Sequence, residues 1–123
     1  MTLPIRVLVT GAGGFIGSHL VTSLKKKGYW VRGADIKAPE FSPSDADEFQ
    51  LLDLRRRDNC LRATAGVDEV YALAADMGGM GFISAHHAQI LYNNSLINLH
   101  TLDTARENGV TRYLYTSSAC IYP

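Results

Sequence analysis

The chain has 123 residues, with twelve basic and twelve acidic side chains and a formal net charge of zero. This length suits one domain, and the balanced charge argues against nucleic acid or an anionic membrane as partners, because both need a net basic face. The two cysteines are too few for a disulfide scaffold or a zinc ribbon, and the 46% of hydrophobic residues argues against a disordered chain.

The first residues carry no targeting or membrane signal. Residues 1–4 lack a basic segment followed by an apolar core, and the apolar run after them ends at Thr10, far short of the ~20 residues that a membrane span needs. The four histidines have no partners at metal-ligand spacing. We therefore expect a soluble, cytoplasmic protein without a metal site.

Short β-type runs alternate with helical patterns, which predicts a parallel sheet with crossover helices. In chain order, the predicted strands are residues 5–9, 29–34, 49–52, 69–75 and 112–116. The predicted helices are residues 15–27, 58–65 and 84–108. The expected fold class is α/β, a Rossmann-type doubly wound parallel sheet with about five strands in the order 3-2-1-4-5. Residues 1–123 would form one NAD-binding domain.

The last predicted helix shows an apolar repeat. It begins with Ser84 as an N-cap, and Gly109 stands just past its end, as Gly28 does after the first helix. Apolar residues at intervals of three or four predict one buried face. The residues of this face are Ala85, Ala88, Tyr92, Leu96, Leu99 and Leu102.

Residues 10–17 read Thr-Gly-Ala-Gly-Gly-Phe-Ile-Gly and lie between a predicted strand and a predicted helix. In that context three glycines at this spacing are typical of a dinucleotide-binding turn. The first allows a tight turn, the second lets backbone amides approach a pyrophosphate, and the third lets the helix pack close to the strand. The alternative is a glycine-rich turn without a ligand. The expected cofactor contacts here are Gly11, Gly14, Phe15, Ile16 and Gly17.

Two carboxylates follow the second and third predicted strands. Asp35 stands at the distance from the glycine loop that suits a ribose-binding acid. It would accept hydrogen bonds from the ribose hydroxyls and repel a 2′-phosphate, which favours NAD over NADP, although Lys37 weakens that preference. Asp53 and Leu54 are expected to reach the adenine. The alternative for Asp53 is a helix cap or a solvent-facing acid.

Three segments resemble the extended short-chain dehydrogenase/reductase superfamily in its nucleotide-sugar-modifying branch. They are the glycine loop, Leu73-Ala74-Ala75, and Thr-Ser-Ser-Ala at residues 116–119. A narrower resemblance, to the epimerases that act on GDP-mannose, is carried by residues 75–83, 92–94 and 117–123. The likeness runs from the first predicted strand to the last residue.

The resemblance implies an NAD-dependent epimerase of a nucleotide sugar, with GDP-mannose as the partner in the narrower case. Bound NAD would oxidise the sugar C4 to a ketone, which acidifies the protons on C3 and C5. An acid/base pair would invert those carbons before hydride returns to C4. By the same resemblance, Leu73, Ala74 and Ala75 lie beside the cofactor ribose. The implied substrate contacts are Gly78, Gly79, Met80, Gly81, Ser118, Ala119 and Cys120.

Two of these substrate contacts have implied catalytic roles. Ser118 matches a serine that hydrogen-bonds the reacting hydroxyl, and Cys120 matches a thiol that moves the proton at C3 and C5. A thiol suits this task, because its unperturbed pKa is about 8.5 and nearby cationic groups lower that pKa. Without such a resemblance a lone cysteine is better explained as a small buried residue, and that is the expectation for Cys60.

The catalytic Tyr-x-x-x-Lys pair of the superfamily is missing, since no tyrosine of the chain has a lysine four positions later. We therefore expect the N-terminal portion of a longer enzyme, without its substrate lobe and inactive alone. Tyr113–Tyr115 would form an exposed sheet edge, so self-association is expected. Two alternatives stay open: another nucleotide-sugar 4-epimerase or dehydratase, or a non-catalytic NAD-binding module.

Overall fold

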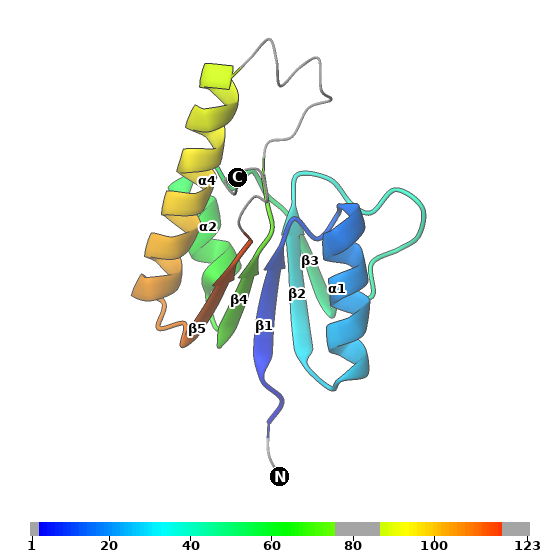
Figure 1. Cartoon of the computed structure of the whole chain (residues 1–123). Helices are drawn as coiled ribbons and strands as arrows, with labels where there is room; N and C mark the ends of the chain where they lie inside the picture. Colours follow the sequence, from blue (N-terminus) through cyan, green and yellow to red (C-terminus); the bar gives the residue numbers. More distant parts are fainter. Residues whose placement is uncertain (1–2, 76–86, 117–123) are drawn as a thin grey trace, which may run out of the picture.

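The computed structural model describes residues 3–75 and 87–116. Strands and helices alternate along this part of the chain except at one place, where a loop joins the second strand to the third (Figure 1). The strands are β1 (Arg6–Thr10), β2 (Trp30–Asp35), β3 (Glu48–Leu51), β4 (Glu69–Ala72) and β5 (Arg112–Tyr115). The helices are α1 (Phe15–Lys26), α2 (Arg57–Thr64) and α4 (His87–Glu107). All neighbouring strands are parallel, in the order β3-β2-β1-β4-β5, which confirms the predicted α/β class and strand order.

Helices cover both faces of the sheet, with α1 on one face and α2 and α4 on the other (Figure 1). Strand β1 serves both sides, because successive side chains of a strand point to opposite faces. Val7 and Val9 pack with the α1 residues Val21 and Leu24, whereas Leu8 packs with the cluster that includes α2 and α4. Two covered faces explain why residues 7–9, in the middle of this strand, are all apolar.

Strand β4 ends at Ala72, earlier than the predicted end at residue 75. The reason is a side chain of the neighbouring strand. Thr10 pairs with Ala72 in the register of β1 and β4, and its hydroxyl accepts hydrogen bonds from the backbone N–H groups of Leu73 and Ala74, each 3.0 Å long. Those two N–H groups therefore bond to a side chain in place of a strand ladder.

The buried face of α4 is not the one that its apolar residues predict. Leu99 and Leu102 are 64% and 52% exposed, and Tyr92 and Ala88 are exposed as well. The buried residues of α4 are Asn93, Ile97, Thr101, Thr104 and Ala105. Its predicted start at Ser84 lies outside the described residues, as does Ala85.

Two threonines can be part of this buried face because their hydroxyl groups are hydrogen-bonded within the helix. The hydroxyl of Thr101 donates to the carbonyl of Ile97 at 2.6 Å, and that of Thr104 to the carbonyl of His100 at 2.7 Å. A threonine bonded in this way to the preceding turn carries no unsatisfied donor into the interior. Apolar periodicity alone gives the wrong orientation here.

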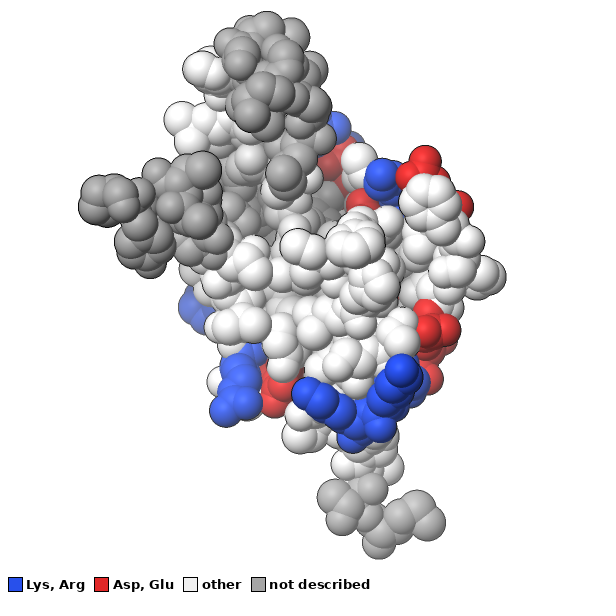
Figure 2. Space-filling view, turned by 45° about the vertical axis from the view of Figure 1, so that its right-hand side comes forward, with Lys and Arg blue, Asp and Glu red and all other residues white. Residues whose placement is uncertain are grey.

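The helix ends agree with the sequence. Gly28 and Gly109 have φ angles of +91° and +77°, the left-handed conformation that glycine adopts readily after a helix. None of the three described helices combines the length and the apolar character needed to cross a bilayer. Figure 2 shows the α1 side of the molecule, where Lys and Arg gather at the lower end, near the last turn of α1 with Lys25 and Lys26.

Candidate functional site

The glycine loop is fastened to the carboxyl end of β2. Gly11 donates its backbone N–H to the carbonyl of Ala34 at 2.8 Å, and Ala12 donates to the same oxygen at 3.3 Å. Gly11 has a φ of +72°, and a Cβ there would lie 2.9 Å from the backbone of Leu73. The first glycine of the motif therefore supplies a left-handed turn and a close approach to the segment after β4.

Gly13 makes the tightest contact of the loop, although the sequence motif does not single it out. Its N–H donates to Asp35 Oδ2 at 2.8 Å. A Cβ on Gly13 would stand 2.0 Å from the carbonyl oxygen of Lys37 and 3.0 Å from Asp35 Oδ2. The loop and the segment after β2 thus touch backbone to backbone. The adjacent pair Gly13-Gly14 is the one sequence signal for this contact.

The first turn of α1 offers backbone donors to an anion. Gly14 is its N-cap and makes no side-chain cap, and the first turn holds no acidic residue. The first N–H groups of a helix have no intrahelical acceptor, and the helix dipole favours negative charge there. A Cβ on Gly17 would lie 2.1 Å from the carbonyl oxygen of Gly11, so the third glycine allows the loop and helix to pack closely.

Gly14 differs from the other loop glycines. Among the described residues, a Cβ there would meet only the carbonyl oxygen of Gly11, at 3.4 Å, and the φ of −83° suits any residue. The fold alone therefore tolerates a larger residue at Gly14. Phe15 and Ile16 are exposed at the same end of the helix, and the ring of Phe15 meets that of His19 edge to face at 4.7 Å between centroids.

Asp35 stands at the end of β2, where a ribose-binding acid is expected. Its Oδ1 accepts the N–H of Ile36 at 2.6 Å and that of Lys37 at 3.4 Å, and its Oδ2 accepts the N–H of Gly13. An ionised carboxylate has about four acceptor positions, so capacity remains for a hydroxyl donor. Helix N–H groups beside such a carboxylate fit the pyrophosphate and ribose of an adenine dinucleotide.

Asp53 follows β3 on the same edge of the sheet, and its carboxylate binds Arg55. Arg55 Nη2 lies 2.7 Å from Asp53 Oδ2. The Arg55 hydrogen bonds lower the pKa of Asp53 and outweigh its partial burial. The side chain of Leu54 is only 4% exposed and belongs to the core, whereas that of Asp53 is 34% exposed.

The segment after β4 is held to the glycine loop by the Thr10 hydroxyl described above, a residue that sequence reasoning did not place in the site. Leu73 packs against the α1-side cluster, Ala74 packs against the opposite one, and Ala75 is exposed. The predicted ribose-side segment thus lies at the carboxyl edge beside Gly11. A threonine immediately before the motif was the available signal.

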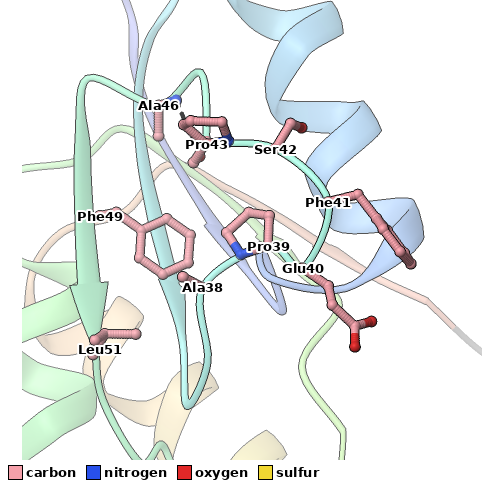
Figure 3. A pocket seen from close by; sticks show the side chains of 10 residues that line it. Ala38, Pro39, Glu40, Phe41, Ser42, Pro43, Ala46, Phe49 and Leu51 are labelled. Atoms are coloured by element: carbon pink, nitrogen blue, oxygen red, sulfur yellow. Dashed lines mark hydrogen bonds between the residues drawn. The ribbon is translucent and has the colours of Figure 1, made fainter.

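Two pockets flank the segment between β2 and β3. One, of about 670 Å³, lies between this segment and β3, and Figure 3 shows Phe49 and Pro39 facing each other across it while Phe41 points away. The other, of about 590 Å³, borders Gly13, Gly14 and Phe15. The second touches the glycine loop and belongs to the candidate site. The first lies outside it.

The remaining predicted site residues lie outside the described part of the chain. They are Gly78, Gly79, Met80, Gly81, Ser118, Ala119 and Cys120. Cys60 is fully buried, its thiol donates to the carbonyl of Leu54 at 3.1 Å, and burial raises its pKa. It is therefore the small core residue expected. Within residues 3–75 and 87–116, no three His, Cys, Asp or Glu side chains could hold a metal ion together.

Comparison with known proteins gives matches over nearly the whole chain. The family described as the NAD dependent epimerase/dehydratase family matches residues 7–123. GDP-mannose 3,5-epimerase 1 of Oryza sativa subsp. japonica is 54% identical over 121 residues, and GDP-mannose 3,5-epimerase of Arabidopsis thaliana is 51% identical. These alignments cover 97% of the chain and 32% of each relative, so the chain spans about a third of their length.

A solved structure has the same fold around a bound dinucleotide. UDP-glucose-4-epimerase from Stenotrophomonas maltophila, with bound NAD and formylated UDP-arabinopyranose, superposes with a TM-score of 0.83 at 26% identity. The match covers 96% of the chain and 38% of that structure. The resemblance predicted from the loop and strand-end segments is confirmed at the level of the family.

Proposed function

The chain belongs to the NAD dependent epimerase/dehydratase family, and from that premise we propose that it is the NAD-binding portion of a nucleotide-sugar epimerase, in particular of a GDP-mannose 3,5-epimerase. The observation that carries NAD binding is the joined pair of Gly13 and Asp35 beside the uncapped start of α1. The choice of GDP-mannose is supported by the two plant relatives, which the chain matches over about a third of their length.

Each part of the site has one role in this proposal. The N–H groups at the start of α1 bind the pyrophosphate, and Asp35 accepts the hydroxyls of the adenosine ribose. Asp53 accepts a hydrogen bond from the adenine, while Leu73, Ala74 and Ala75 lie beside the ribose of the cofactor. A 2′-phosphate would bring negative charge to Asp35, so we expect NAD to bind more tightly than NADP.

When bound, NAD supplies the acceptor that oxidises the sugar C4 and the donor that restores it. Cys120 would be one member of the acid/base pair at C3 and C5. One member removes the proton from one face of the sugar and the other delivers a proton to the opposite face, which inverts the carbon. Ser118 would hydrogen-bond the reacting hydroxyl. Gly78, Gly79, Met80, Gly81 and Ala119 would contact the sugar nucleotide. The support for these roles is sequence resemblance, since the residues lie outside the described part of the chain.

The 123 residues alone are proposed to bind NAD without turning over substrate, because none of their tyrosines has the lysine partner of the family. In the superfamily that lysine lowers the pKa of the tyrosine so that the phenolate can take the hydroxyl proton. The same feature favours the second candidate, a non-catalytic NAD-binding module. Another nucleotide-sugar 4-epimerase is the third.

Calorimetric titration of the purified chain with NAD and with NADP tests the proposal. Binding of NAD, weaker binding of NADP, and no epimerised product from GDP-mannose are the expected results. Failure to bind NAD would overturn it, and product formation would overturn the inactive-portion statement. A Tyr-x-x-x-Lys pair encoded after residue 123 favours the enzyme, whereas a stop codon there favours the binding module.

A further inference from the structure

We propose that Arg55 is a positioning residue that sets the preference of the site for adenine, acting through the carboxylate of Asp53. This inference rests on the proposed function, because it concerns the base of the dinucleotide that the site would bind. It adds a residue that neither the glycine motif nor the carboxylates after β2 and β3 identify.

Arg55 holds both oxygens of Asp53. Asp53 Oδ1 accepts the backbone N–H and the Nε–H of Arg55, each at 3.0 Å. Asp53 Oδ2 accepts Nη2–H at 2.7 Å and shares the Nε–H at 3.2 Å. The planar guanidinium is pre-organised for such a two-point grip, so the carboxylate is fixed in orientation as well as in charge.

The turn itself is anchored from α2. The side-chain amide of Asn59 donates to the carbonyl of Asp53 at 2.9 Å, and the backbone N–H of Arg56 donates to the same carbonyl at 3.3 Å. The Asp53 carbonyl is therefore held by bonds that do not involve the Arg55 side chain, whereas that side chain binds the Asp53 carboxylate. The side chain of Asp53 stays 34% exposed, open to a ligand.

Counting acceptors shows what the carboxylate can still bind. Three N–H groups of Arg55 fall on about four acceptor positions, which leaves one. The lowered pKa keeps the group ionised, so it accepts and does not donate. Adenine offers an amino donor at C6, whereas hypoxanthine carries a carbonyl oxygen there that would face the carboxylate with like polarity. An oriented Asp53 therefore selects adenine.

Arg56 provides a matched control in the same turn. It is also an exposed arginine with an acidic partner two residues away, Asp58, at 3.4 Å. Arg56→Ala removes a cation and an ion pair of the turn but none of the bonds to the Asp53 carboxylate. A general effect of charge or turn stability would appear in both arginine variants.

The experiment compares the affinities for NAD and for nicotinamide hypoxanthine dinucleotide in the full 123-residue chain, by calorimetry. The unaltered chain and Arg56→Ala are expected to prefer NAD by about tenfold, the scale of a hydrogen bond to a charged group. Arg55→Ala is expected to reduce that preference at least threefold, mainly by weakening NAD. Arg55→Lys, which keeps the charge and the backbone bond, is expected to lie between them.

Asp53→Asn completes a double-mutant cycle. If Arg55 acts through Asp53, adding Arg55→Ala to Asp53→Asn changes the preference no further. Equal weakening of both dinucleotides by Arg55→Ala, or a preference that survives it, would overturn the inference and leave NAD binding standing. If the unaltered chain binds neither dinucleotide, the proposed function itself fails. Circular dichroism of each variant checks the fold, and Arg55→Lys carries the test if Arg55→Ala does not fold.

Discussion

The two flanks of the sheet expose apolar side chains in different places. On the flank of β2 and β3, the exposed apolar residues include Phe15, Ile16 and Ile36, which surround the glycine loop and the end of β2. On the flank of β4 and β5, they run along α4 and onto the outer strand. These residues are Leu91, Tyr92, Leu99, Leu102, Leu114 and Tyr115.

The difference separates a surface shaped for a small molecule from one suited to a polypeptide. The first flank positions backbone N–H groups and two carboxylates around its exposed residues, so polar groups fix where a ligand can lie. The second presents an apolar helix face and a strand edge, a surface that another chain can cover. We propose that the isolated chain self-associates through the second flank.

The largest loss of stability is expected from a substitution at one of two adjacent glycines on the first flank. Gly13→Ala forces a Cβ against the carbonyl oxygen of Lys37, at 2.0 Å without relaxation, and is expected to cost about 3 kcal/mol or more in unfolding free energy. Gly14→Ala is expected to change stability by less than about 1 kcal/mol and to weaken NAD binding. Urea unfolding and calorimetric titration measure the two quantities, and equal destabilisation would contradict the assignment.

A smaller effect is expected where Thr10 joins the two flanks. Thr10→Val keeps the shape of the side chain but leaves the N–H groups of Leu73 and Ala74 without their acceptor. We expect it to lower the free energy of unfolding by about 2 kcal/mol. Thr10→Ser retains the hydroxyl and is the matched control. Urea unfolding separates them, and a Thr10→Val chain as stable as the serine variant would show that the hydroxyl does not hold this segment.

Asp47 makes the stability of the first flank depend on pH. Burial alone would raise its pKa, but hydrogen bonds from Lys25 and from the N–H of Val31 outweigh it, so the pKa lies below its ordinary 3.8. The stabilisation is therefore complete well above pH 3.8 and is lost as pH falls through the lower folded value. Asp47→Asn is expected to cost about 1 kcal/mol at pH 7, with the difference shrinking below about pH 4. Urea unfolding across pH tests this, and a constant difference would refute it.

The smallest expected change in stability is on the second flank, where the readout is association. Leu99→Glu with Leu102→Glu is expected to alter the unfolding free energy by no more than about 0.5 kcal/mol, because both side chains are exposed. Sedimentation velocity is expected to show the unaltered chain self-associating and this variant shifted toward monomer. Leu3→Glu, also at an exposed leucine, is the control. A monomeric unaltered chain would contradict the proposal.

The sequence predicts the sheet order well because local pattern and chain connectivity agree. Apolar runs such as Val7–Val9 are buried on both faces, and the glycine motif places the first turn between β1 and α1. The prediction of which face of α4 is buried is wrong. The apolar repeat of this helix lies on an exposed surface, whereas the buried face includes threonines whose hydroxyl groups are hydrogen-bonded within the helix.

Parts of the candidate site could not be predicted from the spacing of residues in the sequence, for a geometric reason. The contact of Gly13 with Lys37 and the Thr10 bonds join segments that are distant along the chain, so they depend on how strand ends align. The Asp53–Arg55 pair is local, but its orientation comes from the turn that α2 anchors. Residue type indicated a site at this edge, and the tertiary fold supplied its arrangement.

The bond between Gly13 and Asp35 also bears on the thermodynamics of association. A loop already fastened to the strand beside it has lost most of its conformational entropy during folding. Binding of a ligand there costs little further conformational entropy of the loop, so more of the energy of the contacts contributes to the affinity. The glycine loop is therefore pre-organised for binding. Its backbone conformation is expected to be nearly the same with and without the dinucleotide.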